Sequence, residues 1–249
     1  MNRSGGEPTL RLPPPFVLRL LWVGVALLVL IGVGAVVGRG VFPGDFARRA
    51  EPARQEVLAA LDREDPLAAQ RPAEIDRFDD RFGDDPLMTM LHILPGGLLL
   101  LLAPLQFSSR IRNRHIPFHR RLGRVLVGSA VVSALAGFYF GLLMPYGGAR
   151  EAAAIVLFGG ILLAAVTLAV VAIRRGDATR HREWMIRALA VAVGIATVRV
   201  VGIVLDVALT PAGVGPADVF VLSLWTGWTV TLAGAEGWIR YTRAEAAKA

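Results

Sequence analysis

The sequence predicts an all-α protein that crosses a membrane with a bundle of six helices. Three observations lead to this fold class. Apolar residues make up 54% of the 249 residues, and the mean hydropathy is +0.54. Charged residues make up only 19%, below the roughly 25% that is usual in soluble domains. The charges are also clustered, and six stretches nearly free of them reach the ~20 residues that a helix needs to cross a bilayer.

The six expected spans are longer than the buried helices of most soluble proteins. They are Phe16–Gly38, Leu87–Phe107, Leu122–Met144, Ala152–Ile173, Met185–Leu209 and Val219–Ile239. The first lies where a secretory signal would lie, but its apolar run exceeds the 7–15 residues of a signal core. No convincing A-x-A cleavage site follows it, so we expect an uncleaved helix. The chain has no cysteine, which excludes a disulfide scaffold, a thiolate metal site and a cysteine nucleophile.

The arginines predict the orientation of the spans. Residues 108–124 hold six arginines and no acid, residues 174–187 hold five arginines against two acids, and both ends of the chain are basic. Cytoplasmic segments carry an excess of basic residues, and an even number of spans places all four on that side. We therefore expect a multi-pass protein of the bacterial inner membrane with both termini in the cytoplasm. The net charge of +7 then reflects topology and contact with anionic lipid heads, and no nucleic-acid partner is expected.

Four regions follow from this reading. They are a tail with the first helix (residues 1–38), an extracytoplasmic acidic loop (39–86), a five-helix membrane core (87–241) and a cytoplasmic tail (242–249). The loop contains 12 of the 20 acids together with 8 arginines. Apolar residues at helical spacing predict two short helices in it, at residues 52–63 and 73–82. The loop is expected to cap the outer end of the bundle, with ligand binding as the alternative.

Ionisable side chains inside the spans are candidates for function because they are costly in a bilayer. His92 lies near the outer end of the second span, and Glu236 near the inner end of the sixth. Arg199 lies within the fifth span, and Asp206 follows seven residues later on the same face. Arg199 is expected either to bind an anion or to form a structural pair. Glu236 is expected either to have a functional role or to neutralise a cytoplasmic arginine.

Two histidines are expected at equal depth on the cytoplasmic side. His119 and His181 lie at the starts of the third and fifth spans, which run in the same direction. Facing imidazoles at one depth suit the axial ligation of a single b-type haem. Alternatives are a divalent metal with His115 as a third nitrogen ligand, a proton-transfer role, or simple anchoring near lipid headgroups. No separate metal motif is expected.

Several short motifs in the second half of the chain resemble a known family. They are His92-Ile-Leu-Pro-Gly-Gly, Ala103-Pro-Leu-Gln106-Phe, His119-Arg-Arg-Leu-Gly-Arg124, His181-Arg-Glu-Trp184-Met-Ile-Arg187, then Arg199, and Trp228 with Glu236. In this order and spacing, over Leu91–Glu236, the chain resembles a bacterial membrane family catalogued as domain of unknown function 2306. Ala188 and Thr231 depart from the small polar residue and the asparagine of the family pattern. The resemblance supports the helical membrane core and implies no known activity. A more distant likeness connects the chain to four-helix b-type cytochromes.

Three classes of function remain open from the sequence. A redox protein would hold one haem b between His119 and His181 and exchange electrons with a quinone or a membrane protein partner. A small-molecule binding or transport protein would use His92, Arg199 and Asp206 at the outer side. An accessory or assembly subunit would have no chemistry, and its polar residues would hold the helices together.

Overall fold

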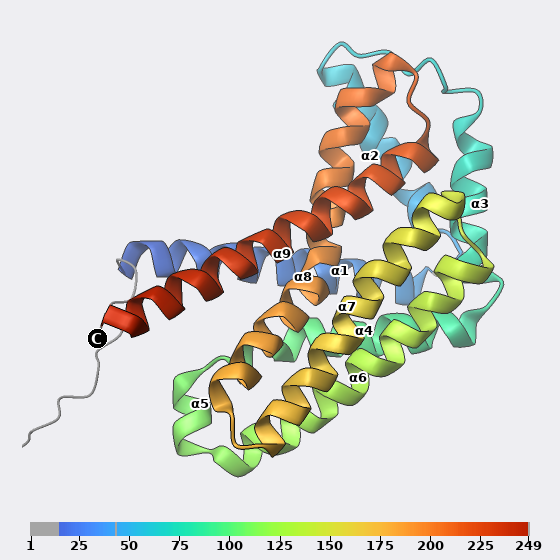
Figure 1. The fold of residues 1–249 in the computed structure, drawn as a ribbon. Helices are drawn as coiled ribbons and strands as arrows, with labels where there is room; N and C mark the ends of the chain where they lie inside the picture. Colours follow the sequence, from blue (N-terminus) through green and yellow to red (C-terminus); the bar gives the residue numbers. More distant parts are fainter. Residues whose placement is uncertain (1–14, 43, 249) are drawn as a thin grey trace, which may run out of the picture.

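The computed structural model describes residues 15–42 and 44–248, and these residues form helices without a strand. Figure 1 shows the chain from blue to red. In chain order the helices are α1 (Pro15–Val41), α2 (Phe46–Ala60), α3 (Arg71–Gly83), α4 (Pro86–Gln106), α5 (Ser109–Arg114), α6 (Ile116–Leu143), α7 (Gly148–Arg174), α8 (Ala178–Leu209) and α9 (Pro216–Lys248). A short 3₁₀ turn, Thr210–Ala212, follows α8.

Five stretches in the described residues are long and apolar enough to cross a membrane. They are Trp22–Val41, Pro86–Gln106, Ile116–Leu143, Gly148–Arg174 and Ala178–Ala212. The prediction of an all-helical membrane protein is therefore confirmed. The sixth predicted span, residues 219–239, lies within α9, which is not among the five. Threonine, tryptophan, serine and glycine fill much of its middle, residues 223–231, and lower its hydropathy.

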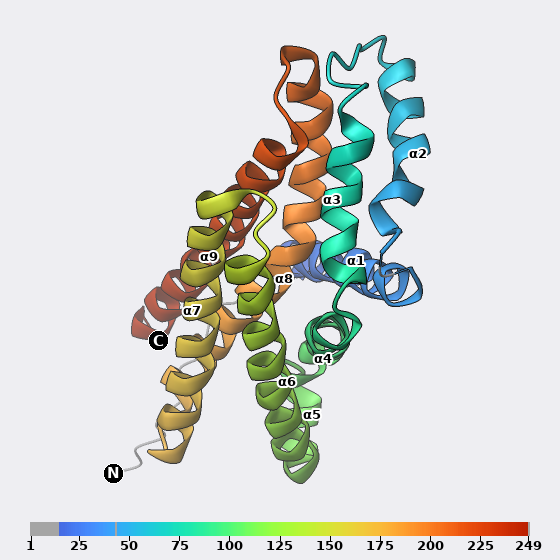
Figure 2. The same ribbon diagram turned by 90° about the vertical axis from the view of Figure 1, so that its right-hand side faces the viewer.

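The helices are arranged in two directions. Figure 2 views α1 and α4 almost end-on, whereas α6, α7 and α8 run up the picture. Thus α1 and α4 cross the longer helices steeply, with α4 against α6 and α1 against α4 and α8. The buried core lies between α6, α7, α8 and α9 and consists largely of alanine and valine with Phe158 and Trp228. Small side chains let membrane helices approach closely and so increase the van der Waals contact between them. This contact matters because, inside a bilayer, the hydrophobic effect does not favour helix–helix contact over helix–lipid contact.

The α8–α9 contact shows how close this approach is. A Cβ added to Gly227 would lie 2.7 Å from the Cα of Val198, so no larger residue fits without a backbone shift. The indole nitrogen of Trp228 donates a hydrogen bond to the carbonyl of Val191 at 3.0 Å. This bond satisfies the polar tip of a buried aromatic ring.

The acidic region between α1 and α4 forms an outer domain, defined here as residues 44–85. Its helices α2 and α3 run roughly in the direction of α8 in Figure 2, and α3 packs against α2, α4 and α9. α2 begins six residues before the predicted helix because Asp79 of α3 accepts hydrogen bonds from the backbone N–H groups of Ala47 and Arg48, at 2.8 and 3.1 Å. A carboxylate at this position satisfies orphan donors of the first turn and complements the helix dipole.

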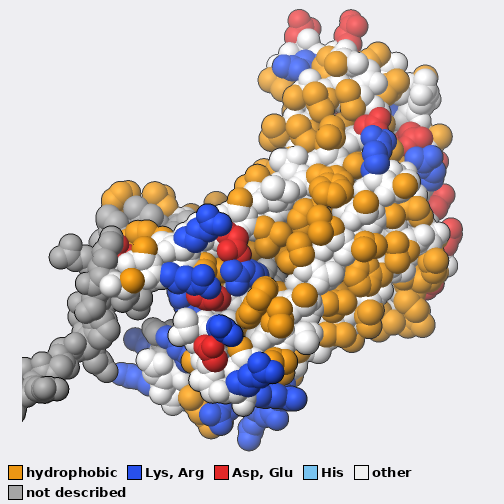
Figure 3. Space-filling view, in the orientation of Figure 1, with side chains coloured by type: hydrophobic (Ala, Val, Ile, Leu, Met, Phe, Trp, Pro, Cys, Tyr) orange, Lys and Arg blue, Asp and Glu red, His pale blue; other side chains and the backbone are white. Residues whose placement is uncertain are grey.

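The surface charge is distributed unevenly along the molecule. Figure 3 shows basic side chains gathered at the end of the molecule where α5 lies and α9 ends, with a few acidic ones among them, whereas acidic and basic side chains lie together toward the opposite end. Hydrophobic side chains cover the broad area between them. Large apolar residues such as Leu101, Leu135 and Leu143 are more than half exposed there. A continuous apolar belt of this kind marks a surface that faces lipid.

Candidate functional site

An ionic network joins the outer domain to the end of α8. Asp206 of α8 accepts hydrogen bonds from Arg54 of α2 at 2.5 Å and from Arg71 of α3 at 3.4 Å. Asp65, in the connection between α2 and α3, accepts from the same two arginines at 2.8 and 2.7 Å. Thr210 donates to Asp206 at 3.2 Å and completes the cluster. We call these five residues the outer network.

Charge balance explains why the outer network can be largely buried. Burial alone would raise the pKa of Asp65, but hydrogen bonds from Arg54, from Arg71 and from the backbone of Leu67 hold it below its ordinary value. For Arg54, burial opposes the charged form, and the bonds to Asp206 and Asp65 outweigh it and raise its pKa. Each buried charge thus has at least one opposite partner, as low-dielectric surroundings require.

A second connection lies at the outer end of α7. Arg81 of α3 donates to Glu151 of α7 at 2.8 Å, and both side chains are almost fully buried, with 7% and 2% exposed. The guanidinium of Arg81 also lies over the rings of Phe78, Phe82 and Phe220, within 4.6–5.4 Å of their centroids. Burial lowers the pKa of Arg81, and Glu151 opposes that shift. The aromatic faces and the carboxylate together stabilise a cation that water does not reach.

A third connection fixes the outer domain to α1. Arg39, near the end of α1, donates to Asp79 at 2.6 Å, and Asp79 is fully buried. The same guanidinium lies 4.8 Å from the ring centroid of Phe46 and 4.5 Å from that of Phe82. Through these three connections the outer domain is attached to α1, α7 and α8 at once. It is therefore an integral part of the helical core.

The structure separates Arg199 from Asp206. The guanidinium of Arg199 donates to the carbonyl of Ile195 on its own helix at 3.0 Å, and no carboxylate forms an ion pair with it among the described residues. His92 lies near enough to interact electrostatically with Arg199. Its Nδ1 is 2.9 Å from the carbonyl of Ser133, whose hydroxyl donates to the carbonyl of His92 at 2.7 Å. His92 therefore joins α4 to α6 by a reciprocal pair of hydrogen bonds.

Glu236 is paired with an arginine, as in one of the two roles that the sequence allows. Its carboxylate accepts two hydrogen bonds from Arg187 of α8, at 2.5 and 3.0 Å. Glu183 of α8 pairs in the same way with Arg243 of α9. Two parallel bonds from one guanidinium fix geometry as well as charge. The inner ends of α8 and α9 are thus joined by two ion pairs.

His119 and His181 lie in the first turns of α6 and α8, close enough to each other to interact electrostatically. The Nδ1 of His181 lies 3.0 Å from the carbonyl of Ala169, whereas the Nδ1 of His119 is buried without a hydrogen-bond partner. His115 lies at the junction of α5 and α6 and is exposed. Within the described residues, no group of three or more metal-ligating side chains is assembled.

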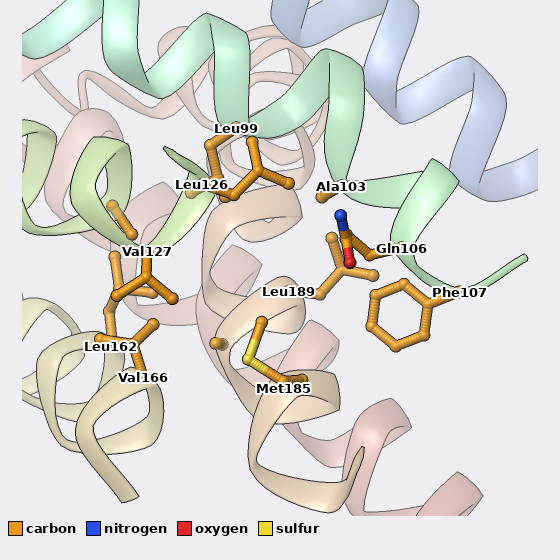
Figure 4. A pocket seen from close by; sticks show the side chains of 12 residues that line it. Leu99, Ala103, Gln106, Phe107, Leu126, Val127, Leu162, Val166, Met185 and Leu189 are labelled. Carbon is orange, nitrogen blue, oxygen red and sulfur yellow. The ribbon is translucent and has the colours of Figure 1, made fainter. Parts of the chain in front are cut away.

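Two cavities are relevant to binding. One, of about 370 Å³, lies in the outer domain between α2 and α3, beside the outer network. Its lining includes Glu51, Arg54, Arg63, Asp65 and Arg71 together with apolar residues such as Leu58. The other, of about 20 Å³, lies between α4, α6, α7 and α8. Figure 4 shows that its walls are apolar except for Gln106.

Comparison with known families adds to this geometry. A family model described as predicted membrane protein DUF2306 matches residues 89–239, which is more than half of the chain. The chain belongs to the DUF2306 family. The predicted resemblance is thereby confirmed. No curated protein and no solved structure matches the chain.

The DUF2306 region contains α4 to α9, whereas α1 and the outer domain lie before it. Glu151 and Asp206 lie inside the DUF2306 region, and each binds an arginine of the outer domain. The sequence singled out Asp206 but missed Glu151, Arg54, Arg71 and Arg81. The available signal was the high content of both acids and arginines in the loop, which indicates ion pairs without saying which residues form them.

Proposed function

We infer that six helices of this DUF2306 protein cross the bacterial inner membrane, with both termini in the cytoplasm. Three observations support this topology: the arginines at one end of the molecule, the outer domain at the other, and a ninth helix of 33 residues. A helix of that length spans about 50 Å at 1.5 Å per residue, more than a bilayer core requires. The outer domain then lies outside the cytoplasm.

The absence of cysteine makes this topology simple to test. A single cysteine at Ala69 of the outer domain or at Ala178 between α7 and α8 has no competing thiol, and both positions are exposed. In intact cells, a membrane-impermeant maleimide should label Ala69→Cys, and Ala178→Cys only after lysis. A reporter fused after Lys248 should be active only in the cytoplasm. Labelling of Ala178→Cys in intact cells would overturn the proposed orientation.

We propose that the protein binds a small carboxylate-bearing molecule at its outer face. The observation that carries this proposal is the cavity of about 370 Å³ in the outer domain. Ligand sites are typically concave, of about 300–1,000 Å³, mostly apolar, with a few fixed polar groups. This cavity combines apolar side chains such as Leu58, Pro72 and Ile75 with guanidinium and carboxylate groups.

Arg63 is the group in this cavity that best suits recognition of an anion. The other two lining arginines, Arg54 and Arg71, are engaged in the outer network. Arg63 is exposed, donates to the carbonyl of Val207 at 3.2 Å, and forms no ion pair with a carboxylate among the described residues. A planar guanidinium without an acidic partner favours a carboxylate ligand, which it can bind through two hydrogen bonds.

The outer network connects this cavity to the membrane core. Arg54 and Arg71 line the cavity and also bind Asp206 at the end of α8. A ligand that moves either arginine would change an ion pair of α8. This connection supports binding with a structural consequence in the membrane. It does not require that the ligand be transported.

The experiment compares matched ligands and matched variants. The purified protein in detergent is tested by thermal shift with a panel of small carboxylic acids, including benzoate, each paired with its uncharged amide. At least one acid is expected to bind more tightly than its amide. Arg63→Gln is expected to weaken the binding of that acid about tenfold, the effect of losing a charge-assisted hydrogen bond. Arg49→Gln on α2, whose ion pair is with Asp45 outside the cavity, should have no effect. No preference for any acid over its amide would overturn the proposal.

Haem binding between His119 and His181 stays a prediction. A porphyrin needs a cavity in the range of several hundred Å³. The cavity between the helices that carry these residues has about 20 Å³, room for roughly one water molecule. A reduced-minus-oxidised spectrum with a b-type band that disappears in His181→Ala would support haem. A colourless protein after haem-supplemented expression would refute it.

A further inference from the structure

Basic side chains gather where the ends of α5, α6 and α8 meet on the proposed cytoplasmic side. Arg112 of α5 and Arg120 of α6 lie close enough to His119 to interact with it, as does His181. Arg182 of α8 interacts in turn with Arg112. Among the described residues no ion pair joins any of these three arginines to a carboxylate. Glu183, the residue after Arg182 on α8, interacts with Arg182 electrostatically, but its carboxylate is bonded to Arg243. We call these five side chains the inner cluster.

The inner cluster differs from the outer network in this lack of partners. In the outer network, acids of the same chain neutralise the arginines. Like charges that converge without counter-charges repel one another, and their arrangement is favourable only when an anion neutralises them. The position of the inner cluster at the cytoplasmic end of the membrane helices places that anion at the level of lipid headgroups.

Two buried polar atoms beside the inner cluster lack hydrogen-bond partners. They are the side-chain amide nitrogen of Gln106, at the end of α4, and the Nδ1 of His119. An unpaired buried donor costs ~1–3 kcal/mol, so both atoms indicate a partner that is not part of this chain. The amide nitrogen can only donate, and it therefore requires an acceptor such as a carbonyl or phosphate oxygen.

The small apolar cavity lies next to these two atoms. On α6, its lining residues Leu126 and Val127 follow His119 by about two turns, and on α8, Met185 follows His181 by one turn. Residues at these spacings share a helix face, so the histidines lie at the cytoplasmic end of the cavity. Figure 4 shows Gln106 on one side of it. A polar, positively charged end thus adjoins an apolar interior that lies within the membrane.

We propose that this site binds one anionic phospholipid of the cytoplasmic leaflet. Its phosphate lies among Arg112, Arg120 and Arg182, with His119 as a further donor. An ester carbonyl accepts the hydrogen bond from Gln106. A single methylene group beside that carbonyl enters the apolar cavity, which has room for about one group of that size, while the rest of each chain stays in the bilayer. The site therefore recognises the charge of the head and the ester of the same molecule.

Native mass spectrometry of the detergent-purified full-length chain tests this proposal. Phosphatidylglycerol and phosphatidylcholine are titrated separately, and bound lipid is counted per protein. We expect one tight phosphatidylglycerol and a clear preference over phosphatidylcholine. Arg112→Gln with Arg120→Gln should weaken the binding of phosphatidylglycerol about thirtyfold, since each basic residue near the surface contributes about five- to sixfold. Arg174→Gln with Arg175→Gln removes the same amount of charge from the end of α7. This control should change the affinity for phosphatidylglycerol less than about threefold.

Gln106→Leu provides a second, independent test, because it keeps the side chain's volume and removes the donor. It should weaken both lipids about fivefold and leave the preference for phosphatidylglycerol unchanged. Equal losses in the two double-arginine variants would show general surface attraction and overturn the specific site. Unaltered binding in Arg112→Gln with Arg120→Gln, or in Gln106→Leu, would overturn it too. Inorganic phosphate that displaces the lipid completely at millimolar concentration would identify a free-phosphate site instead.

Discussion

The buried ion pair between Arg81 and Glu151 gives the sharpest test of how the outer domain is attached. Glu151→Leu removes the carboxylate and leaves the guanidinium of Arg81 without its hydrogen-bonded counter-charge. Loss of one partner from a buried pair costs ~3–5 kcal/mol of unfolding free energy. The lost hydrogen bond from the backbone N–H of Gly147 to Glu151, at 2.6 Å, adds ~1 kcal/mol. Glu151→Leu is therefore expected to destabilise the protein by about 4–6 kcal/mol.

Two further variants separate loss of charge pairing from loss of packing. Arg81→Met with Glu151→Leu removes both charges, and it should recover at least half of the stability lost in Glu151→Leu, because no unpaired charge remains. Arg150→Gln alters the neighbouring residue, whose ion pair with Asp218 is exposed, at 67% and 46%. Exposed pairs contribute ~0–1 kcal/mol, so this control should unfold like the unaltered protein.

Chemical and thermal unfolding in detergent, followed by circular dichroism, measures these differences. Limited proteolysis between α2 and α3 reports release of the outer domain independently. Two results would refute the reasoning. One is that Glu151→Leu unfolds like Arg150→Gln. The other is that the double variant is no more stable than Glu151→Leu, which would show that charge pairing is not the source of the stability.

Three other predictions concern packing and charge. Gly227→Ala places a methyl group 2.7 Å from the backbone of Val198 and should destabilise by ~1–3 kcal/mol in thermal unfolding. Gly234→Ala, on the same helix with no neighbour within 4 Å, should be neutral or slightly stabilising. Two arginines hold the pKa of Asp65 below its ordinary value despite burial. The ionised carboxylate therefore stabilises the fold fully above its ordinary pKa, and this contribution is lost as the pH falls through the lowered pKa of the folded protein. Proteolysis of the outer domain should therefore accelerate between about pH 4 and pH 2, and less so in Asp65→Asn, which has already lost that contribution. Glu236→Gln should lower the melting temperature by an amount equivalent to ~1 kcal/mol, because it leaves a half-buried arginine without its counter-charge.

The membrane helices were predictable because one physical requirement dominates their sequence. A bilayer helix must be about 20 residues long and nearly uncharged, and that requirement is visible without tertiary information. The helices α4, α6, α7 and α8 extend the predicted spans by a few residues at one end or both, since hydropathy marks the apolar segment and not the helix end. In α9, tryptophans and hydroxyl groups that pack against α8 weaken the hydropathy of the sixth span.

The ion pairs could not be predicted, because pairing depends on tertiary structure. Glu151 binds an arginine 70 positions away, and the sequence offers eight arginines in the loop as equivalent partners. The sequence placed Arg199 and Asp206 on one helix face, which is correct for their spacing. Seven residues correspond to ~10 Å along a helix, too far for an ion pair. Asp206 instead binds arginines of the outer domain, which the periodicity of α8 does not reveal.

The two ends of the molecule differ in how completely their arginines are paired with acids: at the inner end Arg187 and Arg243 are paired, but the arginines of the inner cluster are not. The outer domain has no headgroup layer to supply anions to its interior, so its own acids neutralise Arg54, Arg71 and Arg81. At the inner end, Arg112 and Arg120 have no ion pair with an acid among the described residues, and the cytoplasmic leaflet supplies anionic lipid heads. An acid paired with Arg112 or Arg120 would compete with lipid for that arginine. If the proposed topology and lipid site are correct, these unpaired arginines serve both to orient the protein and to bind lipid.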